Sequence, residues 1–433
     1  MREAYYRTIR QLADEGDGPL PEEMQSSAQL IYSSPATLAF NSPGAQGYGV
    51  KRAGLAIPGS VMLLVAPGCC GRNTKLLAEV PGYEDRFFFL LMDESDIVNG
   101  NHLAKVSQAV CEILDFLEER PSCVMICSTC VDALLGTDWE RVCRRAEEAA
   151  GLPVRPCYMY ALTREGRKPP MVLVRQAIYS LLEPAERHAR TVNLIGNFSA
   201  LIDDCELYDI LQQMGIRTIN EIARCEDFAA YQAMAHANFN VVLDPEARLA
   251  ADDMEKRLGM PYLELTRLYQ ADKIHRQYHS LAAALGSTID DEAAYGACRE
   301  CAAALLQHCG SLRLCIGEMM HADPFELALA MIGYGHRVEE IYALPSAADR
   351  AYIRRLAEVS PATRVYTNLS PTMIHYDSGS AAADLTIGMD AAYYHPAAPN
   401  VPWNEERQPF GYAGVIQLMN AMEQAWEEAY ESE

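Results

Sequence analysis

The chain has 433 residues, half of them hydrophobic, and length alone suggests about three domains. Its formal net charge of -23 argues against binding to nucleic acid, whose phosphates require basic partners, and against binding to an anionic membrane surface. No apolar run approaches the roughly 18 residues of a membrane helix, and the first residues lack the apolar core of a signal peptide. We therefore expect a cytoplasmic protein. Its cysteines are then expected to be thiols or metal ligands.

Residues 1–30 are charged and helical in pattern, with a break rich in glycine and proline, and we interpret them as an N-terminal arm. A loop over 33–45 and a helix over 46–55 are expected next. They lead into the first strand of the fold.

Two apolar runs of strand length each end in cysteine. Val61 to Ala66 is followed by Pro67-Gly-Cys-Cys70, and Val124 to Ser128 is followed by Thr129 and Cys130. Buried parallel strands read as short apolar runs, and ligands bind beyond their carboxyl ends. We therefore expect the thiols of Cys69, Cys70 and Cys130 at one sheet edge, where a soft metal or an iron-sulfur cluster would suit them.

The alternative for each of these cysteines is a buried role, because free cysteine packs as a small apolar residue. Placement just after a strand favours the ligand role for Cys69, Cys70 and Cys130. Cys127 lies inside its run and suits both roles equally.

Further along the chain, strands and helices alternate. Strands are expected at 86–92, 191–197, 239–243, 312–317, 338–344, 363–367 and 384–387, and helices at 102–119, 205–216, 247–258 and 324–332. This alternation predicts an α/β protein with parallel sheets. The simplest division is three αβ domains over 31–185, 186–305 and 306–433, the last ending in a helix.

Other candidate chemistry in the sequence is weaker. Cys298, Cys301 and Cys309 lie on one face of an alanine-rich helix, which favours a core role over a metal site. His321, His375 and His395 are expected at the surface of loops. The sequence has no Gly-x-x-x-x-Gly-Lys-Ser/Thr loop, so nucleotide hydrolysis would have to come from another protein.

Several short motifs in order resemble the nitrogenase component 1 superfamily, which includes nitrogenase-like reductases. They are Pro67-Gly-Cys-Cys70, Glu94-Ser-Asp-Ile-Val-Asn-Gly100, Cys130-Val-Asp-Ala-Leu-Leu-Gly-Thr-Asp138, Val192-Asn-Leu-Ile-Gly-Asn197, Gly259-Met-Pro-Tyr262 and Phe410-Gly-Tyr-Ala-Gly414. The resemblance implies three Rossmann-like αβα domains with parallel sheets, and a homodimer or a heterodimer with a related subunit. It also implies an iron-sulfur cluster near the subunit interface and electrons from a separate ATP-hydrolysing iron-sulfur reductase.

The chain departs from this family in its cluster ligands. The family uses three cysteines per subunit, and the first would fall near Phe40 and Asn41, where there is none. One of Cys69 and Cys70 together with Cys130 would give a twofold dimer four thiolates, enough for a 4Fe-4S cluster. All three, which we favour, would give six, the number that the eight-iron cluster of nitrogenase takes.

The chain also departs in the ligands of the molybdenum cofactor. The cysteine ligand would fall near Leu243 to Pro245, where there is none, and the histidine ligand near His375 or His395 in an unlike context. We therefore expect no nitrogenase-type molybdenum cofactor and no reduction of dinitrogen.

Two functional hypotheses follow. The first is the catalytic component of a nitrogenase-like two-component reductase with an unidentified substrate. The second is a scaffold for metallocluster assembly or a non-catalytic electron-relay subunit. A fold relative that has lost its metal is a third interpretation.

Overall fold

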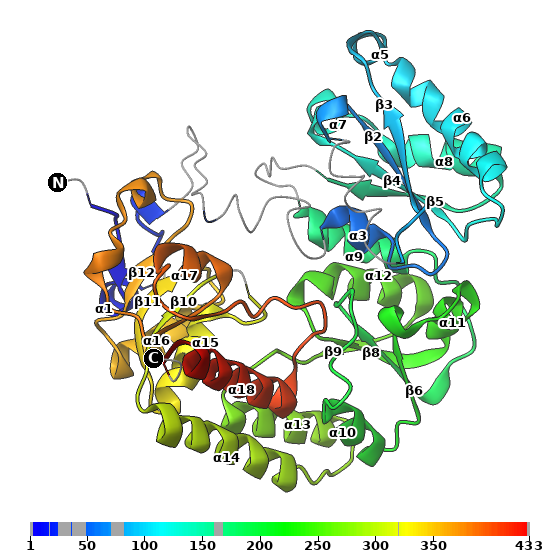
Figure 1. Cartoon of the computed structure of the whole chain (residues 1–433). Coiled ribbons are helices and arrows are strands. Elements are labelled where there is room, and N and C mark those ends of the chain that lie inside the picture. The colour runs from blue at the N-terminus through cyan, green and yellow to red at the C-terminus, as the bar shows by residue number, and fades with distance from the viewer. Residues whose placement is uncertain are drawn as a thin grey trace. The chain divides into compact units, whose positions relative to one another are not determined.

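A computed structural model of the chain describes residues 3–16, 18–24, 36, 49–70, 82–159, 168–318 and 320–430. By compactness the chain divides into two units, each assembled from segments distant in sequence (Figure 1). Unit 1 comprises residues 1–45, 201–215 and 267–433, and unit 2 comprises residues 46–200 and 216–266. Most of the loop expected over 33–45 and the start of the helix expected over 46–55 lie outside the described residues.

Unit 2 contains two four-stranded parallel sheets. The first has the order β3-β2-β4-β5, with the strands Phe87–Leu91, Val61–Ala66, Val124–Ser128 and Val154–Tyr158. The second has the order β7-β6-β8-β9, with the strands Thr218–Glu221, His188–Ile195, Ala237–Val242 and Tyr262–Glu264. Among the described residues, unit 2 includes the α-helices α3 (Val50–Gly54), α5 (Glu94–Asn99), α6 (Asn101–Phe116), α7 (Cys130–Leu135), α8 (Trp139–Ala150), α9 (Pro170–Tyr179), α11 (Phe228–Ala233) and α12 (Arg248–Leu258).

Strand β2 shows why its sheet is covered on both faces. Successive side chains of a strand point to opposite faces, and all six residues of β2 are buried. Val61, Leu63 and Val65 pack in one core with residues of α6 and α8. Met62 and Leu64 pack in a second core with residues of α3 and α9, and this core continues to α12 beside the second sheet. The result is a three-layer αβα arrangement.

Unit 1 contains a six-stranded sheet of order β1-β12-β11-β10-β13-β14. Its strands are Arg7–Thr8, Arg364–Tyr366, Arg337–Tyr342, Arg313–Ile316, Leu385–Ile387 and Asn400–Val401. All pairs are parallel except that of β1, which comes from the predicted N-terminal arm and runs antiparallel to β12. The helices of unit 1 are α1 (Ile9–Asp14), α10 (Leu207–Gln213), α13 (Ala271–Ala284), α14 (Glu292–Cys309), α15 (Pro324–Gly333), α16 (Arg350–Val359), α17 (Met389–Tyr394) and α18 (Gly411–Tyr430).

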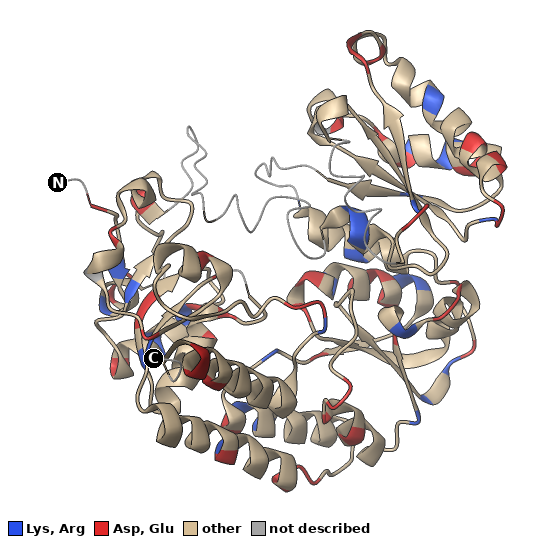
Figure 2. Cartoon of the chain, viewed as in Figure 1, with Lys and Arg blue, Asp and Glu red and all other residues tan. Residues whose placement is uncertain are grey.

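The predicted fold class is confirmed, since strands alternate with helices in parallel sheets as expected. The three domain ranges stay predictions. Charges of both signs are spread over the elements of both units (Figure 2). No helix among the described residues is long and apolar enough to cross a membrane.

Candidate functional site

The carboxyl edge of the β3-β2-β4-β5 sheet brings the predicted cysteines together. Strands β2 and β4 are direct parallel neighbours, with Leu64 opposite Cys127. Cys69 and Cys70 lie in a helical segment, residues 68–70, which follows β2 directly after Pro67, and Cys130 is the first residue of α7, after β4. Parallel strands end at one edge, so the three thiols converge there.

The thiols at this edge are accessible. The sulfurs of Cys69 and Cys70 lie 3.9 Å apart. Cys69 is exposed, and Cys70 and Cys130 are partly buried. Burial raises the pKa of the Cys70 thiol, and the neighbouring sulfurs of Cys69 and Cys130 raise it further because a second negative charge there is disfavoured. A cluster of thiols whose charges repel one another suits a cation that takes several thiolate ligands.

Cys127 is placed differently from the other three. It has no exposed surface and packs in the core together with Met125 and Cys157. Burial raises the pKa of its thiol to about 12, which disfavours the thiolate that a metal requires. Of the two roles left open for Cys127, the structure favours the core role.

A lysine that the motif reasoning missed lies beside these thiols. Lys51 is on α3, part of which has the colour of basic residues in Figure 2. Its side chain is buried. Its ammonium group donates a hydrogen bond of 3.3 Å to the carbonyl oxygen of Cys70. Burial lowers the pKa of Lys51, and the sulfurs of Cys127 and Cys70 act in the opposite direction. A cation here would stabilise thiolates or an anionic cluster.

A buried carboxyl lies in the first turn of α7, the helix that begins at Cys130. The Oδ1 atom of Asp132 accepts hydrogen bonds from His102 at 3.2 Å and from the hydroxyl of Thr137 at 3.1 Å. His102 and Asp132 are each about 1% exposed. Burial raises the pKa of Asp132, and these donors lower it in part. Asp132 and Thr137 belong to the same motif as Cys130, so residues of this motif stabilise the segment that contains the cysteine.

The position where the resemblance implies a molybdenum-cofactor cysteine carries Asp244. Its carboxylate pairs with Arg175 at 2.9 Å, and Arg175 also donates to the carbonyl oxygen of Gly196 at 2.6 Å. Both partners lie in unit 2. An ion pair thus occupies the carboxyl end of β8.

The expectation that His395 is a surface residue is wrong. His395 is 5% exposed, and its Nε2 lies 3.0 Å from Oε2 of Glu340, which has no exposed surface. The hydroxyls of Tyr342 and Tyr376 donate to the same oxygen at 2.5 and 2.6 Å. The other oxygen, Oε1, pairs with Arg364 at 2.7 Å. Tertiary packing of β11 against α17 buries this histidine, and a loop-like sequence gives no sign of it.

The other two histidines, His321 and His375, differ in how far they are buried. His375 is exposed as expected. His321 is partly buried, and burial lowers the pKa of its ring to about 4. Cys298 is buried, and Cys301 and Cys309 are partly buried.

A family model described as "Nitrogenase component 1 type Oxidoreductase" matches residues 45–427. A protein of Nostoc sp. named "Nitrogenase iron-molybdenum cofactor biosynthesis protein NifE" is 27% identical over 256 residues, which cover 55% of this chain and 52% of the relative. A protein of the same name from Klebsiella pneumoniae is 28% identical over 215 residues, which cover 46% of each chain. The chain spans about half the length of the curated relatives it matches.

A solved structure described as nitrogenase Cp1 at pH 6.5 matches with a TM-score of 0.71 and 17% identity. The match covers 95% of this chain and 97% of that one. At this level of identity the likeness concerns the fold alone.

Proposed function

Since the chain belongs to the nitrogenase component 1 type oxidoreductase family, we propose that it is the cluster-bearing component of a nitrogenase-like two-component reductase. Cys69, Cys70 and Cys130 would hold an iron-sulfur cluster. The observation that carries the proposal is the convergence of these three thiols at the carboxyl edge of one sheet, with the Cys69 and Cys70 sulfurs 3.9 Å apart. When bound, such a cluster supplies one-electron transfer at low potential.

The residues around the thiols have separate tasks in this proposal. Lys51 offsets negative charge on the sulfurs, and burial around Cys70 limits access of water to that side. The hydrogen bond between Asp132 and His102 anchors α7, the helix that begins at Cys130, to α6. Cys69, the exposed thiol, faces outward, where a second subunit could contribute ligands.

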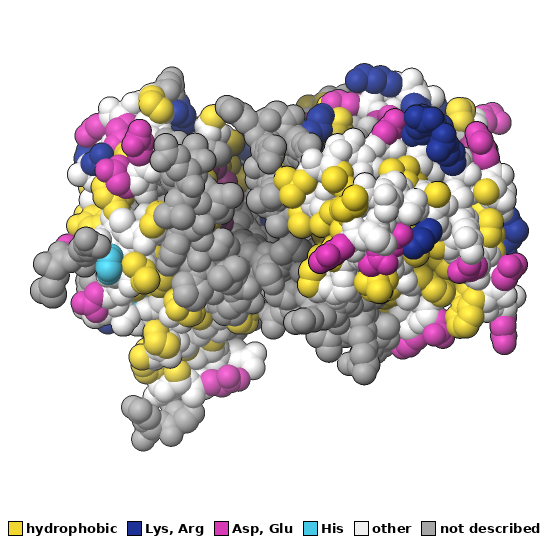
Figure 3. Space-filling model, turned by 90° about the horizontal axis from the view of Figure 1, so that it is seen from above, with side chains coloured by type: hydrophobic (Ala, Val, Ile, Leu, Met, Phe, Trp, Pro, Cys, Tyr) yellow, Lys and Arg dark blue, Asp and Glu magenta, His cyan; other side chains and the backbone are white. Residues whose placement is uncertain are grey.

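Exposed apolar side chains near the cysteines support a subunit interface at this edge. Leu134 and Leu135 lie on α7, which begins at Cys130, and they are 61% and 52% exposed. Leu91 is 55% exposed, and its Cδ1 lies 3.8 Å from the point where a Cβ on Gly68 would sit. Figure 3 shows hydrophobic side chains on the upper surface of unit 2. A second chain packed on this edge would bury these apolar side chains. A dimer would obtain four or six thiolates from its two chains.

The test is anaerobic iron and sulfide analysis of the wild type, Cys130→Ala and Cys111→Ala. Cys111 is a partly buried cysteine of the same unit, on α6, and serves as the matched control. We expect the wild type and Cys111→Ala to contain equal iron and Cys130→Ala to lose most of it. Unchanged iron in Cys130→Ala would remove the proposal.

A scaffold for metallocluster assembly is the second candidate, and the names of the relatives favour it. The relatives described above are named as cofactor biosynthesis proteins. An electron paramagnetic resonance spectrum of the anaerobic, dithionite-reduced protein, taken before and after incubation with an apo-ferredoxin, separates the two roles. A redox component keeps its signal, whereas a scaffold passes its cluster to the acceptor.

A further inference from the structure

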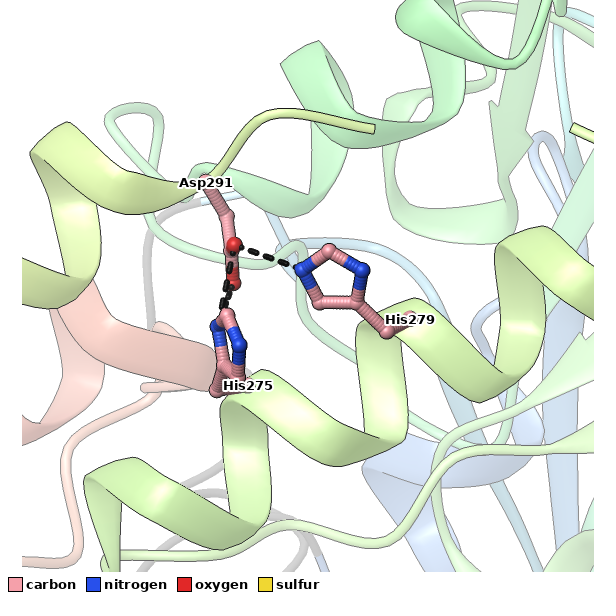
Figure 4. Close-up of side chains that lie close together, drawn as sticks. All are labelled: His275, His279 and Asp291. Carbon is pink, nitrogen blue, oxygen red and sulfur yellow. Dashed lines mark hydrogen bonds and ion pairs between the residues drawn. The ribbon is translucent and has the colours of Figure 1, made fainter. Parts of the chain in front are cut away.

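Two histidines and a buried aspartate meet in unit 1, on elements that carry none of the predicted cluster ligands. His275 and His279 are four residues apart on α13, so they lie on one face of the helix. Asp291 immediately precedes α14. Figure 4 shows both rings directed from α13 toward the carboxylate of Asp291. We propose that these three residues bind a divalent transition metal ion, with Zn²⁺ as the best fit.

The distances in this cluster are close to those between the ligand atoms of a metal site. Nδ1 of His275 lies 3.0 Å from Oδ1 of Asp291, and Nε2 of His279 lies 3.0 Å from the same oxygen. The three ligand atoms all lie within 4.8 Å of one another. Zinc binds nitrogen and oxygen ligands at about 2.0 to 2.2 Å in a tetrahedron, which places neighbouring ligand atoms roughly 3.3 Å apart. A metal ion therefore needs only small side-chain movements to enter.

Asp291 is held ready for this role. An aspartate at the start of a helix ordinarily accepts a hydrogen bond from a backbone N–H of the first turn, but the side chain of Asp291 makes no such bond. Instead, the hydroxyl of Tyr412 donates to its Oδ2 at 2.6 Å. A donor on the second oxygen orients a carboxylate ligand, as outer partners do in metal sites.

Access separates this cluster from the one around Glu340. The side chains of His275 and His279 are 30% and 44% exposed, so an ion can enter from solvent and keep a water as its fourth ligand. In the other cluster, Cys315, Glu340 and His395 are all buried, and two tyrosines and an arginine already occupy the Glu340 carboxylate. An ion entering that cluster would have to displace these partners and has no path from solvent through exposed side chains.

The experiment measures Co²⁺ binding to the full chain, because cobalt replaces zinc in such sites and its visible spectrum reports its ligands. Thiolate-bound cobalt has an intense near-ultraviolet band that a nitrogen and oxygen site lacks, which separates this site from Cys69, Cys70 and Cys130. We expect His279→Ala to bind one equivalent of Co²⁺ less per chain than the wild type, with the thiolate band unchanged. His375→Ala, which removes an exposed histidine of the same unit, should match the wild type.

Tyr412→Phe gives a graded readout that a purely structural histidine pair would not show. Loss of an outer partner weakens metal affinity by about 10- to 100-fold, so this variant should still bind cobalt, but more weakly. Asp291→Asn keeps the shape of the side chain and removes its charge. This variant should bind one equivalent of Co²⁺ less per chain than the wild type. The proposal is overturned if His279→Ala and Asp291→Asn bind as much cobalt as the wild type, or if His375→Ala loses as much as they do.

Discussion

At the scale of single residues, burial decides what the side chains near the thiols can do. Lys51 and His395 are two residues whose burial the sequence does not reveal, because it depends on contacts with segments distant in the chain. A lysine in the sequence reads as a surface residue. Cysteines after strands could be predicted because a sheet edge follows from strand order alone.

Replacing Lys51 tests whether its charge supports the thiolates. We expect Lys51→Met to weaken iron binding by roughly 10- to 100-fold, since it removes a buried positive charge beside Cys70. Chelator competition on the anaerobically reconstituted protein measures this. Lys105→Met is the control, because the Lys105 ammonium pairs with Asp96 at 2.6 Å. Equal iron affinity in Lys51→Met and the wild type would exclude this role.

Glu318 makes the folded state sensitive to pH. The pKa of its carboxyl is raised from 4.5 to about 7, mainly by burial and in smaller part by the charges of Asp390 and Asp349, while a hydrogen bond from the backbone of Leu344 opposes the rise. The folded chain holds this proton more tightly than the unfolded chain. The resulting stabilisation is complete below about pH 4.5 and is lost as the pH rises through about 7.

Glu318→Gln should remove this loss. Between pH 5 and pH 8, we expect the free energy of unfolding of the wild type to fall by up to about 3 kcal/mol more than that of the variant. Urea denaturation of the metal-free protein at both pH values measures the difference. Glu358→Gln, on the exposed side of α16, should behave as the wild type does. An identical pH dependence in Glu318→Gln would show that another group is responsible.

At the scale of elements, strands with a short apolar run were predictable, both where they are fully buried, as β2 and β4 are, and where they are partly exposed, as β3 is. The runs at β2, β4, β8 and β10 are apolar because helices cover both faces of parallel sheets. The sequence does not reveal the two-residue strands β1 and β14, whose pairing depends on β12 and β13. It also gives no sign that β1 joins the sheet of unit 1.

The start of α18 explains the glycine of the Phe410-Gly-Tyr-Ala-Gly414 motif. Glu206 accepts hydrogen bonds from the backbone N–H groups of Tyr412 at 2.7 Å and Ala413 at 3.0 Å, which the helix leaves unpaired. The same carboxyl accepts the hydroxyl of Tyr278 at 2.7 Å. Gly411 has φ +62°, and a Cβ there would overlap both Glu206 and Tyr278.

We therefore expect Gly411→Ala to lower the free energy of unfolding by about 2 to 4 kcal/mol, from backbone strain and overpacking together. Gly286 has φ +67° with nothing within 4 Å of the added Cβ. Gly286→Ala should lower the free energy of unfolding by only about 1 kcal/mol, so this variant measures the backbone strain without the overpacking. Denaturant midpoints measure both. Equal losses in the two variants would mean that the contact with Glu206 is unimportant.

At the scale of the whole molecule, a cluster held by four or six thiolates requires two chains, because one chain offers three accessible thiols at the sheet edge. We expect Leu134→Asp to weaken the dimer at least about tenfold, since it places a charge in an apolar contact. Val359→Asp, at an exposed apolar residue of α16, is the control. Sedimentation of the anaerobically reconstituted protein measures both. A dimer unchanged by Leu134→Asp would place the subunit contact elsewhere.

The neighbouring sulfurs of Cys69 and Cys70 have a practical consequence for handling the protein in air. They are 3.9 Å apart, and Cys69 is open to solvent. Oxygen and peroxide convert accessible thiolates first to sulfenic acid, which a neighbouring thiol then traps as a disulfide. Preparations exposed to air would accumulate a blocked form that takes up no metal until a reductant is added. Colourless protein purified in air would therefore indicate oxidised cysteines and would not show that the native protein binds no metal.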